Sequence, residues 1–134
     1  MATSIKHTYI IDSSALLAHL LHEPHNNTQI TNAINLFYDK NAKFIAPIIL
    51  PFEVGNVLKS CVKSKRLSSL EANKLYKHFL KLPIKYLPLD LKSIFKLSLE
   101  TDLTYYDASY LALQDSTQAP LLTLDKKLLS LTKI

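Results

Sequence analysis

The architecture of the chain is set by the segment Thr8-Tyr9-Ile10-Ile11-Asp12-Ser13-Ser14-Ala15-Leu16-Leu17. Its first four residues form a β-branched and aromatic run, which predicts a short strand over 8–11. Ser13 or Ser14 is suited to cap a helix over 15–21. Asp12 therefore stands where a strand passes into a helix, as at the start of a strand–helix–strand unit.

Short apolar runs and helical stretches alternate along the rest of the chain. Further strands are expected over 43–46, 84–87 and 120–124, and further helices over 28–40, 48–66, 69–80, 90–101, 105–114 and 125–131. Each crossover is long enough for a parallel return, and the apolar runs lack strict alternation, as buried parallel strands do. Because no repeat, linker or low-complexity tract interrupts this pattern, it predicts a single α/β domain over 1–134.

Composition excludes several classes of protein. The chain has 134 residues, 48% hydrophobic and 20% charged, which is typical of a soluble globular domain. The single glycine, Gly55, excludes glycine-rich phosphate loops, and the single cysteine, Cys61, excludes a disulfide framework or a CxxC site. No targeting segment or membrane-spanning run is visible, so we expect a soluble cytoplasmic protein. The net charge of +5 favours a polyanionic partner only weakly, and more so if some acids share a pocket.

Four carboxylates occupy positions that suggest chemistry. Asp12 and Asp125 follow the first and fourth predicted strands, so a parallel sheet brings both to the same edge. Asp107 interrupts a helix that is otherwise apolar almost all round, where an ionised carboxylate is costly to bury. Glu53 borders the apolar stripe of the helix that begins near residue 48, on the flank that also carries Asn56.

Each acid also has a structural interpretation. Aspartate is a preferred helix N-cap, which would explain Asp12 and Asp125. Thr104 and Asp107 have the spacing of a capping box, and Glu53 is explained equally well as an exposed acid at a helix start. Taken singly, these structural roles are the more frequent ones. Four acids at strand ends and helix starts, without a His/Cys metal set, favour instead a carboxylate cluster held together by hard divalent cations.

Such a cluster has a definite chemistry. Neighbouring carboxylates repel one another unless a cation intervenes, and Mg²⁺ or Mn²⁺ prefers oxygen ligands. Two such ions activate a water and stabilise the leaving oxygen of a phosphodiester. Asp12, Asp107 and Asp125 are the candidate ligands, and Glu53 is a further ligand or helps to deprotonate the nucleophile. The candidate orienting groups are Ser14, Asn56 and Thr123, and the candidate phosphate contacts are Lys126 and Lys127.

At these residues the sequence resembles the PIN-domain nucleases, and within them the VapC-type toxins of prokaryotic toxin–antitoxin pairs. The resemblance is carried, in order along the chain, by Tyr9-Ile10-Ile11-Asp12-Ser13-Ser14-Ala15-Leu16, Glu53-Val54-Gly55-Asn56-Val57-Leu58, Leu103-Thr104-Tyr105-Tyr106-Asp107-Ala108-Ser109-Tyr110-Leu111-Ala112-Leu113 and Leu121-Leu122-Thr123-Leu124-Asp125-Lys126-Lys127-Leu128.

The resemblance implies a three-layer α/β/α fold with a short, mainly parallel sheet of four to five strands. It implies an acidic pocket that holds Mg²⁺ or Mn²⁺, cleavage of single-stranded or looped RNA, a homodimer, and inhibition by a cognate antitoxin. The chain departs from the family in having few residues after Leu131 for a fifth strand, and in having Gly55 inside a helix, where it costs about 1 kcal/mol relative to Ala.

Two other functions remain open: a catalytically silent PIN-like module that binds RNA or protein, and a phosphoacceptor signalling domain. The second is disfavoured because Asp12 is not followed by another acid. Among the remaining features, the histidines at 19, 22 and 25 are interpreted as surface or packing residues and Cys61 as a core residue. The tyrosines at 105, 106 and 110 are suited to stack on bases, but within a buried helix most of them are expected in the core. The apolar residues at 30, 34 and 37 fit either the core or a groove for a partner.

Overall fold

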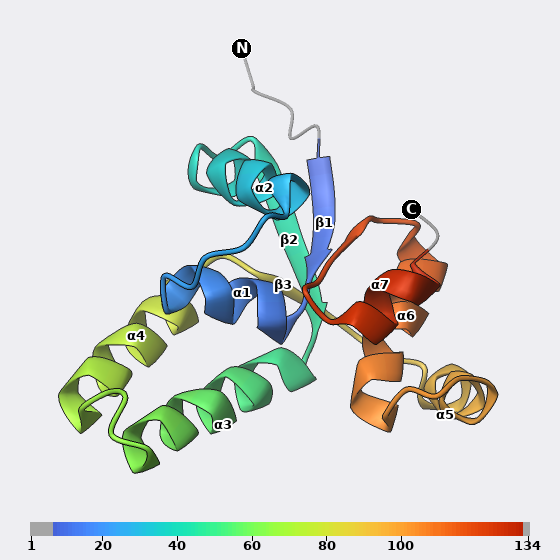
Figure 1. The fold of residues 1–134 in the computed structure, drawn as a ribbon. Coiled ribbons are helices and arrows are strands. Elements are labelled where there is room, and N and C mark those ends of the chain that lie inside the picture. The colour runs from blue at the N-terminus through green and yellow to red at the C-terminus, as the bar shows by residue number, and fades with distance from the viewer. Residues whose placement is uncertain (1–6, 133–134) are drawn as a thin grey trace.

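The computed structural model describes residues 7–132, which form a parallel sheet with helices on both of its sides (Figure 1). The strands are β1 (His7–Ile11), β2 (Ala42–Pro47), β3 (Lys85–Leu87) and β4 (Leu121–Leu122). The helices are α1 (Ser13–Leu20), α2 (Thr28–Tyr38), α3 (Ile49–Lys63), α4 (Ser69–Lys81), α5 (Leu91–Glu100), α6 (Tyr105–Thr117) and α7 (Lys126–Leu131). Every predicted element is therefore present, with ends that differ by a few residues.

The sheet has the strand order β3-β2-β1-β4, and all of its pairs are parallel. In the register, Ile10 lies beside Ile45 of β2 and Leu121 of β4. Because the strands run the same way, the segments that follow β1, β2 and β4 leave from one edge of the sheet. The predicted α/β class with a parallel sheet is confirmed, and within residues 7–132 the sheet has four strands rather than five.

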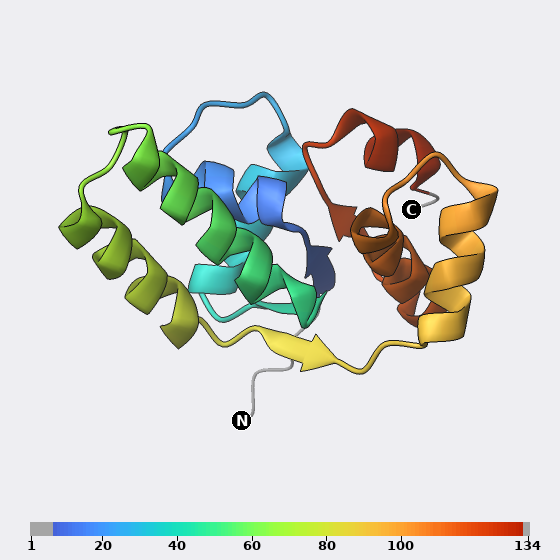
Figure 2. The same ribbon diagram turned by 90° about the horizontal axis from the view of Figure 1, so that it is seen from below.

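The two faces of the sheet are covered by different helices. Figures 1 and 2 show α1 to α4 on one side and α5 to α7 on the other. Alternate residues of β1 supply the two cores, since Ile11 packs with α1 to α4 whereas Ile10 packs with α5 to α7. This alternation is the period of two that a strand imposes, and it produces three layers.

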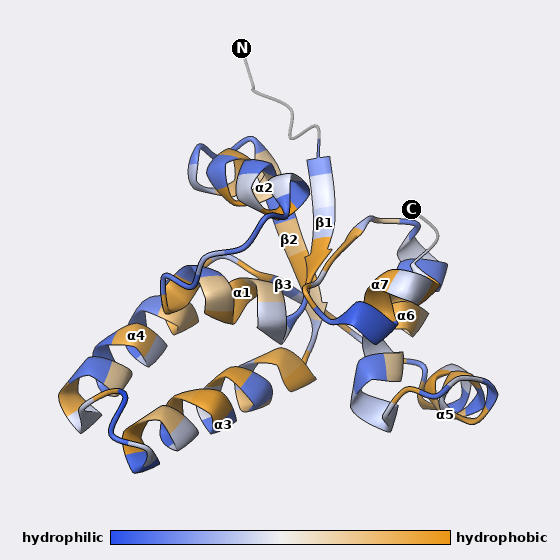
Figure 3. Ribbon diagram, viewed as in Figure 1, coloured by the Kyte–Doolittle hydropathy of each residue, from blue (hydrophilic) through white to orange (hydrophobic). Residues whose placement is uncertain are grey.

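The core beneath α1 to α4 shows where the apolar side chains of α2 lie. Ile30, Ile34 and Phe37 are buried in it, so they belong to the core and not to a partner groove. Figure 3 shows the same tendency in the sheet, where hydrophobic residues predominate in the middle of β2 and in the C-terminal half of β1. Cys61 is buried too, as expected for a small core residue.

Helix caps fix the entry to several helices. The expectation that Ser13 or Ser14 caps α1 is wrong, because Asp12 takes that position and its side chain accepts a hydrogen bond from the backbone of Ala15. Asp12 keeps an extended backbone, as N-cap residues do, and its short carboxylate reaches a free amide of the first turn. Ser68 caps α4 with a full capping box. None of the described helices is both long and apolar enough to cross a bilayer.

Candidate active site

Asp12 is the most firmly held of the four acids. Its side chain is 3% exposed. One carboxylate oxygen, Oδ1, accepts hydrogen bonds from the Ser14 hydroxyl at 2.7 Å and from the Ala15 amide at 3.0 Å. The other oxygen, Oδ2, accepts one from the Thr123 hydroxyl. Asp12 therefore caps α1 and also binds the segment that follows β4.

Ser14 and Thr123 join the loop after β1 to the loop after β4. The Ser14 hydroxyl oxygen accepts a hydrogen bond from the Leu124 amide at 2.9 Å, and the Thr123 hydroxyl oxygen accepts one from the Asp125 amide at 3.0 Å. The backbone of Asp12 pairs with Leu122 in the sheet. These contacts fix the backbone of Asp125 relative to Asp12.

Asp125 begins α7 as its N-cap. Its Oδ1 accepts a hydrogen bond from the Leu128 amide at 3.1 Å. Its side chain is partly exposed at the carboxyl edge of the sheet. The capping role predicted as the structural alternative is thus present at both Asp12 and Asp125, and in each case it uses only part of the carboxylate's capacity to accept hydrogen bonds.

Glu53 connects α3 to α6. The Tyr110 hydroxyl donates a hydrogen bond to its Oε1 at 2.6 Å, and Tyr110 itself is 1% exposed. Glu53 is partly buried, so it is not the exposed helix-start acid of the structural alternative. Sequence reasoning treated Tyr110 as a core aromatic and missed this contact. The available signal was chemical, because a buried tyrosine hydroxyl needs a hydrogen-bonding partner.

Asp107 lies in the first turn of α6, where the helix dipole favours a negative charge. The hydroxyl oxygen of Thr104 accepts a hydrogen bond from the Asp107 amide at 3.1 Å. Within residues 7–132, the return bond from the Asp107 carboxylate to the backbone of Thr104, which would complete a capping box, does not form. The cap therefore leaves the Asp107 carboxylate available for another partner.

The four acids influence one another electrostatically. Burial raises the pKa of the Asp12 carboxyl, and the charge of Asp107 raises it further against the lowering effect of its hydrogen bonds. Burial also raises the pKa of Glu53, with added contributions from the charges of Asp107 and Asp12. The pKa of Asp107 is raised by burial and then by the charge of Asp125. Each acid therefore lies within electrostatic range of at least one other acid of the set.

The donor set suits a hard divalent cation, although a finished metal cage is not formed. All four groups are carboxylates, and a bound cation would offset both the burial of Asp12, Glu53 and Asp107 and the repulsion among the acids. Within residues 7–132, however, no three His, Cys, Asp or Glu side chains lie in an arrangement that would hold a metal ion. The sequence-based expectation that the four acids converge on one cation therefore stays a prediction: the acids lie within electrostatic range of one another, but those described form no ready-made coordination geometry.

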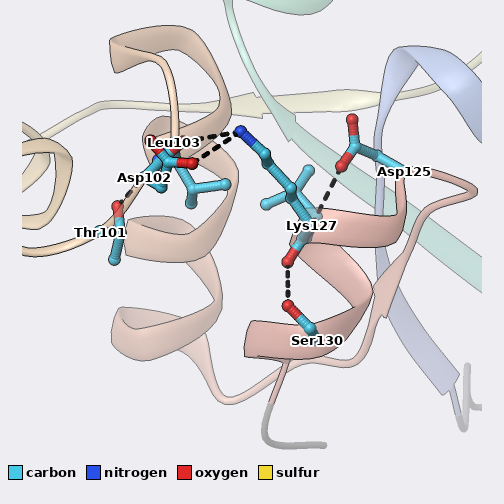
Figure 4. Close-up of polar contacts among 7 residues, drawn as sticks. Thr101, Asp102, Leu103, Asp125, Lys127 and Ser130 are labelled. Atoms are coloured by element: carbon cyan, nitrogen blue, oxygen red, sulfur yellow. Dashed lines mark hydrogen bonds and ion pairs between the residues drawn. The ribbon is translucent and has the colours of Figure 1, made fainter.

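The other predicted site residues are less closely tied to the acids. Asn56 is exposed on α3, three residues beyond Glu53. Lys126 is also exposed, and the Lys127 ammonium pairs with the Asp102 carboxylate at 3.0 Å (Figure 4). The charge of Lys127 nevertheless lowers the pKa of Asp107, so it lies within electrostatic range of the site.

Two tyrosines are placed differently from the sequence-based interpretation. Tyr105 and Tyr106 were expected in the core, but they are 39% and 58% exposed. The prediction was wrong because the first turn of α6 is less covered than its middle, where Ala108, Ser109 and Tyr110 are buried. The apolar composition of the helix did not reveal this difference between its ends.

His19, His22 and His25, in α1 and the loop after it, are not arranged in the described chain so that they could hold a metal ion together. His19 contacts the Tyr38 hydroxyl at 3.0 Å, and the same hydroxyl lies 3.3 Å from His78. Burial lowers the pKa of His19, followed by the effect of the positive charges of His22 and His78. This agrees with a surface and packing role that joins α1, α2 and α4.

Comparison with known proteins gives a consistent family assignment. The family model described as the PIN domain matches residues 9–134. The crystal structure of PAE2754 from Pyrobaculum aerophilum is similar to this chain with a TM-score of 0.73 and 27% sequence identity, over 95% of this chain and 87% of that one. A search of curated proteins finds no match.

Proposed function

Because the chain belongs to the PIN-domain family, whose members are generally nucleases, we propose that it is a metal-dependent endoribonuclease and the toxin of a toxin–antitoxin pair. The observation that carries this proposal is the partial or full burial of Asp12, Glu53 and Asp107 beside other acids. Burial raises the pKa of each of these carboxyls, and the charges of neighbouring acids of the set contribute a smaller rise. Burying carboxylates next to other acids is costly unless the site binds a cation, so this arrangement favours a functional role over four separate caps.

The surroundings of each side chain suggest a separate role for it in the proposed reaction. Asp12 and Asp107 would hold Mg²⁺ or Mn²⁺ together with Asp125, and Ser14 and Thr123 would keep the Asp12 carboxylate in a fixed orientation. A bound divalent cation would supply the Lewis acid that polarises the phosphate and activates water. Glu53 has a raised pKa and an anchoring hydrogen bond from Tyr110, as suits a group that receives a proton from the attacking water.

Asn56, Lys126 and Lys127 complete the proposed site. Asn56 would orient groups near Glu53, and the two lysines would contact substrate phosphates. The Asp102 partner of Lys127 is almost fully exposed, at 96% of its side chain, so the ion pair is weak enough to exchange for a phosphate. Lys127 is therefore able to contribute charge to RNA binding without a large rearrangement.

Cleavage of RNA with purified protein tests the proposal. The wild type is expected to cut single-stranded RNA with Mg²⁺ or Mn²⁺ and to stop when EDTA is added. Asp107→Asn should abolish cleavage while the circular dichroism spectrum stays unchanged, because the Thr104 cap uses the backbone of Asp107 and not its carboxylate. Undiminished cleavage by Asp107→Asn would contradict the proposed role of the acids.

A catalytically silent PIN-like module is the second candidate. One observation favours it: no three carboxylates in the described chain are arranged so that they could hold a metal ion. Calorimetric titration separates the two. Binding of Mn²⁺ that is lost in Asp107→Asn supports the nuclease, whereas RNA binding without any binding of Mg²⁺ or Mn²⁺ supports the silent module.

A homodimer and a cognate antitoxin are the partners proposed with this function. Helix α5 carries Leu91, Phe95 and Leu99 at successive turns, and they are 62%, 57% and 72% exposed. An exposed apolar row of this kind is typical of a surface that meets another protein. Light scattering of the purified protein measures its oligomeric state, and co-expression with the product of the neighbouring reading frame tests for the antitoxin.

A further inference from the structure

Two exposed tyrosines lie at the N-terminal end of α6. Tyr105 and Tyr106 are 39% and 58% exposed, and their rings meet edge to face with centroids 6.5 Å apart. The preceding residue, Thr104, caps the helix, so the two rings stand on a backbone that is fixed by a hydrogen bond. An exposed aromatic ring on a rigid helix end is suited to contact a flat ligand.

The position of Tyr106 relates it to the candidate active site. On a helix, residues three and four apart share a face, so Tyr106 lies one turn before Tyr110 on the same side of α6. Tyr110 holds Glu53 through its hydroxyl, and the intervening Asp107 is coupled electrostatically to the other acids. Tyr106 is thus carried by the same helix end as Asp107, and this end of α6 is called here the rim of the site.

A cation that could contact a phosphate group lies within electrostatic range of this rim. Lys127 acts electrostatically on Asp107 from the side of α7. The N-terminus of α6 adds the positive end of a helix dipole, which favours phosphate groups. A ring for a base and a cation for a phosphate are the two elements with which proteins bind single-stranded nucleic acids.

We propose that Tyr106 stacks on an unpaired base next to the phosphodiester that is cleaved, and so selects single-stranded RNA as the substrate. This inference rests on the proposed ribonuclease function. Stacking is tolerant of sequence because every base has a flat face, but a base inside a duplex already stacks on its neighbours and does not offer that face. Tyr106 is thus a positioning residue for the strand and takes no part in bond cleavage.

The test compares three variants. Tyr106→Ala removes the ring, and Tyr106→Phe keeps the ring without the hydroxyl. Leu80→Ala is the control, because Leu80 is 58% exposed, as Tyr106 is, and lies on α4, which carries none of the four acids. Cleavage of a short labelled single-stranded RNA is measured with Mn²⁺ for KM and kcat, and binding is measured by fluorescence anisotropy.

Loss of one stacked base weakens binding roughly 5- to 150-fold, so Tyr106→Ala should raise KM and Kd within that range and change kcat less. Tyr106→Phe and Leu80→Ala should stay close to the wild type. If Tyr106→Ala also stays close, or if Tyr106→Phe is equally impaired, the stacking role is wrong although the nuclease proposal stands. If the wild type cleaves no RNA, the nuclease proposal fails, and unchanged anisotropy in Tyr106→Ala then rejects stacking separately.

Discussion

Replacement of Asp12 separates its role in the fold from its proposed role in catalysis. The carboxylate accepts hydrogen bonds from the Ala15 amide and from the hydroxyls of Ser14 and Thr123. Asp12→Ala removes all of these acceptors. Loss of an N-cap costs about 0.5–2 kcal/mol, and a buried hydroxyl left without its acceptor costs about 1–3 kcal/mol more. The variant should therefore lose about 1.5–5 kcal/mol of unfolding free energy, or roughly 5–25 °C in Tm.

Asp12→Asn should behave differently. The amide oxygen still accepts from Ala15 and Ser14, and the amide nitrogen donates to the Thr123 hydroxyl, which is able to accept. The substitution also removes a charge whose ionised form burial disfavours. Its Tm in EDTA at neutral pH should thus stay within a few degrees of the wild type, by an order-of-magnitude argument from the retained cap. RNA cleavage should nevertheless be lost in both variants.

Differential scanning calorimetry with and without Mn²⁺ checks this reasoning. A cation at about 100 times its Kd stabilises a folded protein by about 2.7 kcal/mol, so the wild type should gain Tm and Asp12→Asn should gain little. If Asp12→Asn loses as much stability as Asp12→Ala, hydrogen-bond acceptance is not what Asp12 contributes to the fold. If Asp12→Asn cleaves RNA like the wild type, Asp12 has no role in catalysis.

Three further outcomes are expected. The pKa of Glu53 is raised in the folded state, so its ionisation lowers the stability of the protein, and this loss is recovered as the pH falls. Glu53→Gln should therefore be more stable than the metal-free wild type at pH 7. The difference between their melting temperatures should shrink towards pH 4. Tyr110→Phe removes a hydrogen bond that lowers the pKa of Glu53, so calorimetry should show weaker Mn²⁺ binding, and an unchanged affinity would argue against Glu53 as a ligand. Gly55→Ala should stabilise the protein by about 0.5–1 kcal/mol in urea denaturation, because Ala has the higher helix propensity. The added Cβ would meet the Tyr76 ring at 3.5 Å, an ordinary van der Waals contact. Destabilisation would show that α3 and α4 pack more tightly than this distance indicates.

The architecture follows from local signals that each act within a few residues. Proline at 47, 83 and 120 and caps such as Ser68 and Asp90 divide the chain where the apolar period changes, and the structure places its elements there. Long crossovers then leave parallel pairing as the favoured arrangement. Strand order does not follow from such signals, because the pairing of β1 with both β2 and β4 depends on contacts between distant segments.

The candidate site could be predicted only as a set of positions. Asp12 and Asp125 follow strands, so their shared edge is a consequence of parallel topology. The hydrogen bonds from Thr123 to Asp12 and from Tyr110 to Glu53 join residues far apart in sequence, and their geometry depends on how the helices pack. The exposure of Tyr106 escaped prediction for a related reason, since composition does not tell which turn of α6 the neighbouring elements leave open.

The pairing of β1 with β4 has a consequence for translation. β1 is the first of these strands to leave the ribosome and β4 is the last, yet they are neighbours in the sheet. A nascent chain without β4 lacks both Asp125 and the Thr123 hydroxyl that reaches Asp12. If the protein cuts RNA, each copy is therefore inert towards its own messenger until nearly all of the domain has been translated.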